Sequence, residues 1–168
     1  LSYEPGYEDS LEGRATSEGI SVREALMDAM ADGRPILYLF GDYDYSVQPQ
    51  FDFISRDQSV FGLSDGGAHV GVLCDASVPT YMLAYATRDR QKGPQLPLEF
   101  VVHKMSQDTA QVYGFTDRGV IAEGYKADVN IIDYDKVRLH DPEMVFDLPS
   151  GGKRLIQKAD GYTATICG

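Results

Sequence analysis

The stretch Leu63-Ser-Asp-Gly-Gly-Ala-His-Val70 is the most informative part of this chain. Apolar residues lead into it, and their run predicts a short buried strand over Val60–Ser64. Asp65 then meets a glycine pair, and His69 follows four residues later. A carboxylate at the carboxyl end of a buried strand, before backbone that suits glycine, is typical of an α/β barrel that presents a catalytic acid or a metal ligand. An Asp-Gly turn in which the carboxylate caps its own backbone accounts for the same letters, and both interpretations stay open here.

Composition and charge limit the class of protein. The chain has 168 residues, 43% of them hydrophobic and 24% charged, which is typical of one soluble globular domain or slightly more. The net charge is −11, and acidic residues are spread from Glu4 to Asp160. We therefore expect neither nucleic acid nor an anionic membrane as a partner, because both bind basic surfaces. No apolar run reaches the length of a membrane span.

The cysteines and the two ends of the chain add further expectations. Cys74 and Cys167 have neither the spacing of a metal-binding pair nor the number that a disulfide scaffold needs, and no secretory signal opens the chain, so we expect a cytoplasmic protein. The chain begins at Leu1 and stops just after the alternating residues Tyr162, Ala164 and Ile166. We expect it to be a fragment of a longer protein.

The first part of the chain is predicted to be mainly helical. Ser21 and Glu24 form a capping-box pattern, which predicts a helix that runs to about Ala31. A buried strand is expected over residues 36–40. Further helices are predicted over residues 50–56, over 78–87 with Ser77 as the cap, over 98–104 and over 106–114, the last capped by Ser106 and ended by Gly114.

Strands are predicted to predominate after Gly119. A period of two residues indicates strands over 127–133, 154–157 and 162–167, and residues 119–124 are predicted to form a turn, a short strand and a turn. Strands that follow a series of helices indicate a small β module beside an α/β portion. We predict two domains, residues 1–118 and residues 119–168, and we expect the second to be incomplete.

The segment from Ser106 to Asp133 resembles the closing signature of the amidohydrolase superfamily. The resemblance is carried by Gly114-Phe115, Arg118-Gly-Val-Ile121 and Gly124-Tyr-Lys-Ala-Asp-Val129. Ser64-Asp65-Gly66 is similar to the end of the eighth barrel strand in that superfamily. Residues 147–155 and 161–165 are similar to the branch that contains the N-acyl-D-amino-acid deacylases (D-aminoacylases). Together these likenesses extend over residues 20–168.

This resemblance implies a fold and a reaction. The fold would be α/β: residues 1–118 would be the C-terminal part of a metal-dependent (β/α)8 TIM barrel, followed by a small β-sandwich. In the superfamily, zinc or another divalent metal activates a water molecule. Asp65 would receive the proton of that water, pass it to the leaving amine, and also touch the metal. The implied substrate is a small-molecule amide with a non-peptide C–N bond, with an N-acyl-D-amino acid as the best candidate.

The same resemblance implies substrate-binding roles for Ser64, Gly66, Gly67 and His69. The two glycines would let the chain turn beneath the reacting centre. His69 matches a position at which related enzymes place a histidine that faces the substrate or supports the metal site. A loop histidine held by a backbone carbonyl is an equally good interpretation of His69.

The chain departs from the superfamily in its metal ligands. The family takes these ligands from earlier strands, as an HxH motif, a bridging Lys, Cys or Glu, and two further histidines. This chain has His69, His103 and His140, and no HxH motif. We therefore expect the metal to belong to the full-length parent, and the isolated chain to lack both metal and activity.

Two other functions stay open. The letters Gly62-Leu-Ser-Asp-Gly66 match the Gly-x-Ser-x-Gly elbow of serine hydrolases, with Ser64 as the nucleophile and Asp75 with His103 or His140 as its partners. This elbow requires a helix directly after the serine, and the residues Gly66-Gly-Ala-His69 are a poor start for one. Alternatively, the chain is a folded, non-catalytic unit that associates with itself, because open strand edges and uncovered apolar faces favour pairing. We expect a homo-oligomer.

Overall fold

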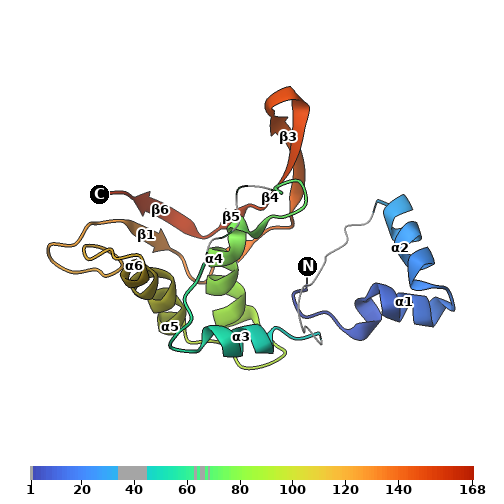
Figure 1. Cartoon of the computed structure of the whole chain (residues 1–168), viewed down its shortest axis with the longest axis horizontal. Coiled ribbons are helices and arrows are strands. Elements are labelled where there is room, and N and C mark those ends of the chain that lie inside the picture. The colour runs from blue at the N-terminus through green and yellow to red at the C-terminus, as the bar shows by residue number, and fades with distance from the viewer. Residues whose placement is uncertain (1, 34–44, 63, 65–66, 68) are drawn as a thin grey trace. The chain divides into compact units, whose positions relative to one another are not determined.

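The computed structural model describes residues 2–33, 45–62, 64, 67 and 69–168. The strand predicted over residues 36–40 lies outside the described residues. The chain divides into two compact units, Leu1–Phe53 and Ile54–Gly168. Helices make up the first unit and the first part of the second, and strands follow (Figure 1). The chain therefore mixes helices and strands, in agreement with the sequence. The predicted domain boundary between residues 118 and 119 stays a prediction.

The first unit is built on short helices. They are η1 (Tyr7–Asp9), α1 (Leu11–Glu18), α2 (Val22–Ala31) and α3 (Gln48–Ile54). The side chain of Ser21 accepts a hydrogen bond from the Glu24 amide, and the Glu24 carboxylate accepts one from the Ser21 amide, so the predicted capping box and its helix are confirmed. Small residues fill the contact between α1 and α2, where Ala15, Ala25 and Ala29 are buried.

Two continuous helical runs form the first part of the second unit. The first run joins η2 (Asp75–Ser77), α4 (Val78–Tyr81) and the π-helical segment η3 (Met82–Asp89). The second joins α5 (Leu98–His103), the π-helical segment η4 (Lys104–Asp108) and α6 (Thr109–Val112). Gly114, at a φ of 76°, ends the second run as predicted.

Both serines that were predicted to cap these helices have other roles. Ser106 lies inside the second run, where its hydroxyl donates a 2.6 Å hydrogen bond to the carbonyl of Val102. No side-chain cap forms at Ser77, whose hydroxyl instead lies 2.5 Å from the side-chain oxygen of Gln157. Ser77 therefore lies at the predicted N-cap position of α4 without a side-chain cap bond, whereas the cap predicted at Ser106 is wrong because that serine bonds to the preceding helical turn.

The strands form three separate antiparallel pairs in the described part of the chain. β1 (Val129–Ile132) pairs with β6 (Tyr162–Ile166), β2 (Arg138–Leu139) with β5 (Ala159–Asp160), and β3 (Glu143–Leu148) with β4 (Gly152–Ile156), the last two being joined by η5 (Pro149–Gly151). The strands predicted over residues 127–133, 154–157 and 162–167 are confirmed as β1, β4 and β6.

Two strand predictions are wrong. Residues 119–124 contain bends and turns but no strand. Residues 60–62 and 64, the described part of the strand predicted over Val60–Ser64, have no strand partner. Both segments are apolar enough for a strand, but none of the described backbone forms a ladder with their described residues.

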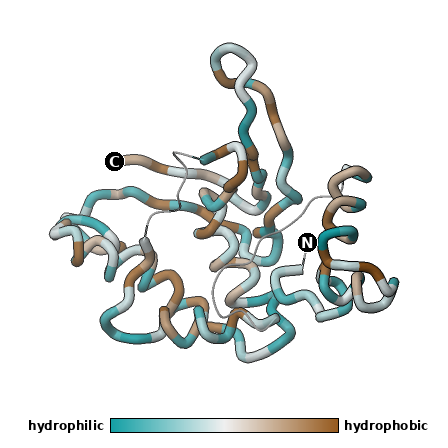
Figure 2. The backbone as a smooth tube through the Cα atoms, turned by 45° about the vertical axis from the view of Figure 1, so that its right-hand side comes forward, coloured by the Kyte–Doolittle hydropathy of each residue, from teal (hydrophilic) through white to brown (hydrophobic). Residues whose placement is uncertain are grey.

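The first helical run holds the strands through its polar side chains. The hydroxyl groups of Thr80 and Tyr162 lie 2.8 Å apart, and so do those of Thr87 and Tyr134. Arg88 donates hydrogen bonds to the carbonyls of Tyr134 and Val137, the second at 2.7 Å. The apolar core between them is formed by Met82, Leu83, Ala84, Ala86, Val101, Ala110 and Val137. Figure 2 shows apolar and polar residues alternating along these helices and strands. None of the helices in the described ranges has the length and apolar character needed to cross a bilayer.

Candidate functional site

The motif begins just after a turn that a buried lysine holds in place. Within the turn, the Ser59 amide donates a 3.1 Å hydrogen bond to the Arg56 carbonyl. The ammonium of Lys104 donates to the carbonyl oxygens of Arg56 and Ser59, at 3.1 and 2.8 Å. Lys104 is only 5% exposed, and a lysine is almost never buried without partners. The entry into the motif is therefore fixed to η4.

The charge of Lys104 is balanced within its own helix. The carboxylate of Asp108 lies 3.4 Å from the lysine ammonium, one turn along the helix. The other oxygen of Asp108 lies 3.1 Å from Nδ1 of His103. The ring of Phe100 lies under the ammonium, 5.7 Å from its centroid. Lys104 is thus held by two carbonyls, a carboxylate and an aromatic face, which explains why a cation is stable in this nearly buried position.

The exit from the motif is held by a strand. His69 has a φ of 62°, and its carbonyl accepts hydrogen bonds from the amides of Val72 and Leu73 at 2.8 and 2.9 Å. Next to this turn, the carbonyl of Val70 accepts a 2.6 Å hydrogen bond from the amide of Leu155 in β4. The loop that carries the motif is therefore anchored at both ends, to η4 before it and to β4 after it.

The structure describes three of the predicted site residues. Ser64 is half-buried, whereas Gly67 and His69 are exposed. A Cβ atom added to Gly67 would meet nothing within 4 Å, so this part of the loop borders open space. Asp65 and Gly66 lie outside the described residues. The three described residues share one anchored loop, and their roles stay predictions.

The described residues do not provide a metal site. Among them, no group of three or more His, Cys, Asp or Glu side chains is close enough to hold an ion. His103 is paired with Asp108, and Nε2 of His140 lies 3.0 Å from the carboxylate of Asp160. The two histidines that the serine-hydrolase alternative would use therefore have carboxylate partners of their own, and no contact in the described part favours that alternative.

The described carboxylates with a clear shift in pKa all have lowered values. Hydrogen bonds from Ser21 lower the pKa of Glu24, and those from Arg118, Lys136, Arg154 and His140 lower the pKa of Asp117, Asp133, Asp147 and Asp160. Burial raises the pKa of the Cys74 thiol, which disfavours the reactive thiolate. These carboxylates belong to ion pairs or, in the case of Glu24, to a helix cap. None of them has the raised pKa that a carboxylic acid needs to donate a proton at neutral pH.

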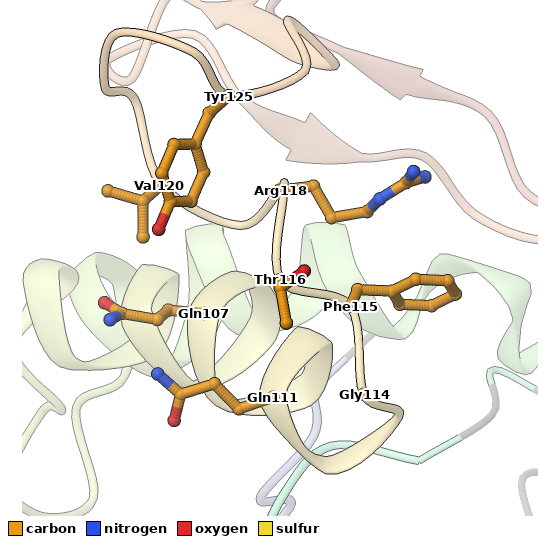
Figure 3. Close-up of a pocket in the computed structure, with 8 residues that line it drawn as sticks. All are labelled: Gln107, Gln111, Gly114, Phe115, Thr116, Arg118, Val120 and Tyr125. Carbon is orange, nitrogen blue, oxygen red and sulfur yellow. The ribbon is translucent and has the colours of Figure 1, made fainter.

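A cavity of about 300 Å³ lies on another part of the second unit. Its lining consists of Gln107, Gln111, Gly114, Phe115, Thr116, Arg118, Val120 and Tyr125. Figure 3 shows Val120 and Tyr125 on the same side as the two glutamine amides, whereas Phe115 and Arg118 extend the other way.

Among the described residues that line this cavity, the one cation, Arg118, is paired with a carboxylate. The Nε atom of Arg118 lies 2.9 Å from Asp117, and its guanidinium stacks 4.7 Å from the centroid of the Phe115 ring. The cavity therefore offers uncharged amide and hydroxyl groups. Ser64, Gly67 and His69, which are the described residues of the predicted site, are not among the residues that line it.

Lys104 was not identified from the sequence. The sequence predicts a helix over residues 98–104 and assigns the lysine no role. Val101 and Lys104 are three residues apart, and both are buried on one face of the helix. A charged residue on the apolar face of a predicted helix was the available signal. Its partners, the carbonyls of Arg56 and Ser59, belong to a turn more than forty residues away.

The comparisons with known proteins give one match. A family model described as "Amidohydrolase family" matches residues 26–167, which is most of the chain. The matched range includes the anchored loop, both helical runs of the second unit, and all three strand pairs. No curated protein and no solved structure gave a match.

Proposed function

Because this chain belongs to the amidohydrolase family, we propose that its protein hydrolyses an amide C–N bond in a small molecule. The observation that carries this proposal is the family match over residues 26–167. The structure adds support, because the loop with Ser64, Gly67 and His69 is anchored at both ends by contacts with η4 and β4. A loop held in this way suits the positioning of reacting groups.

Asp65 is the residue to which we assign the proton transfer. In amide hydrolysis, water adds to the carbonyl carbon, the C–N bond breaks, and the amine leaves with a proton. Asp65 would accept the proton of the attacking water and deliver it to the leaving nitrogen. Ser64, Gly66, Gly67 and His69 would contact the substrate. Members of the family commonly use divalent metals. The described residues do not fit such an ion, so we assign it no step here.

The proposed substrate is an N-acyl-D-amino acid. This finer assignment rests on the likeness of residues 147–155 and 161–165 to the D-aminoacylase branch. The (β/α)8 barrel and the β-sandwich belong to the same proposal, with this chain as a C-terminal part of both. Residues 147–155 lie in the hairpin of β3 and β4. Within it, the Arg154 guanidinium donates two hydrogen bonds of 2.7 Å to the Asp147 carboxylate.

Release of the free amine tests the proposal. The protein is expressed from its complete reading frame, supplied with zinc or manganese, and assayed with N-acetyl-D-amino acids and their L-enantiomers. We expect release from the D series. Asp65→Asn should lower kcat by about 10²- to 10⁴-fold, because the substituted amide accepts no proton. Absence of hydrolysis for every amide tested would overturn the proposed function.

A matched control is available eight residues upstream. Asp57 is exposed and lies in the turn before the motif. Asp57→Asn removes the same charge from a nearby position, and we expect it to leave kcat within about two-fold of the wild type, as surface substitutions do. If Asp65→Asn behaves like this control while the wild type is active, the role of Asp65 is wrong and the family activity stands.

A further inference from the structure

We propose that Lys104 is a positioning residue for the proposed reaction, and that it acts through the turn before the motif to set the position of Asp65. This inference rests on the proposed function and adds to it a residue that acts at a distance from the reacting atoms. Three observations carry it: the partners of the lysine ammonium, the lack of regular structure in the described part of the motif loop, and the π-helical segment to which the lysine belongs.

The partners of the ammonium are backbone atoms of the turn that leads into the motif. An ammonium group has three N–H donors. Two hydrogen bonds go to the carbonyls of Arg56 and Ser59, and the one to Ser59 is buried. The Asp108 carboxylate lies 3.4 Å from the same ammonium. Because the turn is held by its carbonyls, the lysine fixes the path of the backbone itself and not only the position of a side chain.

The described residues of the motif loop have no regular structure of their own. Residues 60–62, 64 and 67 belong to no helix or strand. At the far end, the carbonyl of Val70 accepts the 2.6 Å hydrogen bond from Leu155. In the sequence, Asp65 stands six residues after Ser59 and five before Val70. No strand ladder holds the described residues between these two anchors, so a displacement of the turn would pass along the chain toward Asp65.

The anchor is formed entirely within one unit of this chain. Lys104 and all the partners named above belong to the unit Ile54–Gly168. The lysine is already nearly buried by these residues. We therefore expect the same anchor in the protein expressed from its complete reading frame, whatever else that protein contains.

The lysine belongs to an unusual stretch of helix. The segment η4, which begins at Lys104, is π-helical, and this rare geometry is frequently found at functional sites. The hydroxyl of Thr109 donates a 2.9 Å hydrogen bond to the carbonyl of Lys104, five residues earlier, which is the spacing of π-helical backbone bonds. The departure from α-helical geometry thus begins at the residue that holds the turn, which supports a role beyond packing.

Proton transfer depends steeply on the position of the group that carries the proton. Asp65 has to be within hydrogen-bond reach of the attacking water and of the leaving nitrogen. A misplacement of about 1 Å, caused far from the chemistry, can cost a factor of about 10² in rate. Lys104→Met keeps the apolar stem and removes every donor, so the turn is no longer held. We expect kcat to fall by about 10- to 100-fold.

A double-mutant cycle with Asp65 tests this inference in the protein expressed from its complete reading frame. Residues that act as a unit have strongly non-additive effects. Lys104→Met should therefore lower kcat in the wild type, but should change it by no more than about two-fold in the Asp65→Asn background. A lysine that supports only the fold would lower kcat by the same factor in both backgrounds.

Thr87→Val is the control for a loss of stability alone. Thr87 is buried on the first helical run, and its hydroxyl lies 2.8 Å from that of Tyr134. Valine keeps the shape of the side chain and removes this hydrogen bond, so the fold is weakened while the turn before the motif keeps its anchor. We expect kcat to stay within about two-fold of the wild type. A loss as large as that of Lys104→Met would mean that lost stability explains both variants, and would overturn the positioning role.

Amide hydrogen exchange gives a second readout, which requires no turnover. In Lys104→Met, the amides of residues 60–73 should exchange faster than in the wild type, and by a larger factor than the amides of β1 and β6. In Thr87→Val, the amides of residues 60–73 should show no such selective increase. If Lys104→Met does not fold, Lys104→Gln replaces it in both experiments, because glutamine is shorter by one atom and lacks the charge that Asp108 balances.

The outcomes separate this inference from the proposed function. If the wild type hydrolyses no amide, the proposed function is overturned, and hydrogen exchange alone decides whether Lys104 holds the motif. If Asp65→Asn is as fast as the wild type, the role of Asp65 and this inference are both wrong, while the family activity stands. If Asp65→Asn is slow but Lys104→Met multiplies that loss, or if exchange rises equally in the motif and in β1 and β6, only the positioning role of Lys104 is wrong.

Discussion

The ammonium of Lys104 lies 2.8 Å from the carbonyl oxygen of Ser59, and this hydrogen bond joins the π-helical segment η4 to the turn before the predicted catalytic motif. The carbonyl of Arg56 accepts from the same ammonium at 3.1 Å. The next residues of the chain, 60–62, make no strand ladder of their own. The position of the motif therefore depends on this lysine at its entry and on the bond from Leu155 to Val70 at its exit.

Replacing Lys104 by methionine should destabilise the protein. The apolar stem is kept, but the carbonyls of Arg56 and Ser59 lose the hydrogen bonds from the ammonium, the one to Ser59 being buried, and Asp108 loses its cation. We expect the free energy of unfolding to fall by about 1–3 kcal/mol, measured by urea denaturation. The control is Lys136→Met. It removes the ion pair between Lys136 and Asp133, and the Lys136 side chain is 77% exposed. We expect almost no change there, since exposed ion pairs contribute little. Equal stability of the two variants would contradict the anchoring role of Lys104.

Gly161 should tolerate no side chain. It has a φ of 92°, and an added Cβ would lie 2.4 Å from the Cα of Val137, which is fully buried. Gly161→Ala should therefore lower the free energy of unfolding by well over about 1–2 kcal/mol, which is the cost of a left-handed backbone alone for an L-residue. Gly124→Ala isolates that strain, because Gly124 has a φ of 83° and open space around it. Chemical denaturation of both variants measures the difference, and equal losses would mean that Val137 moves aside.

The contact between Thr80 and Tyr162 should appear as a coupling energy. Their hydroxyls are 2.8 Å apart, and Thr80 is only 7% exposed. A double-mutant cycle with Thr80→Val and Tyr162→Phe should give a coupling of about 0.5–1.5 kcal/mol in the free energy of unfolding. Strictly additive losses would show that this hydrogen bond does not hold β6 to α4.

The ion-pair cluster at Asp160 should make stability depend on pH. Hydrogen bonds from His140 and then Arg138 hold the pKa of the Asp160 carboxyl below its ordinary value. A carboxyl with a lowered pKa in the folded state stabilises the protein above its unfolded pKa of about 4, and loses this effect as pH falls through its folded value. Thermal unfolding should show Asp160→Asn less stable than the wild type at pH 6, with a gap that narrows at pH values below about 4. If the difference in stability between the two proteins stayed constant over this pH range, the lowered pKa assigned to Asp160 would be wrong.

Local signals in the sequence were sufficient for several elements. Ser21 and Glu24 are three residues apart, and their mutual hydrogen bonds begin α2 whatever lies around them. Gly114 ends a helix because it adopts a positive φ at little cost. The alternation in β1, β4 and β6 reflects the two faces of a strand and was visible without partners. Short motifs of the sequence also carried the resemblance to the amidohydrolase superfamily, which the family match over residues 26–167 supports.

Other features were decided by contacts between distant residues. Ser106 looks like a cap, but the helix continues through it because η4 carries Lys104 into a buried position beside the Arg56–Ser59 turn. β3 was missed, although its antiparallel partner β4 lies just beyond a tight turn, in which Ser150 has a φ of 62°. The apolar run before Asp65 predicts a strand, yet its described residues pair with no other strand.

The sequence by itself determined the family, the helix caps with reciprocal partners, and the strands that alternate, because these depend on residues within one or two turns of each other. The tertiary structure alone decided that Lys104 is buried and where the two ends of the motif loop are anchored. Those features depend on which backbone carbonyls and amides lack a local partner, and a group of this kind finds its partner only when the chain has folded around it.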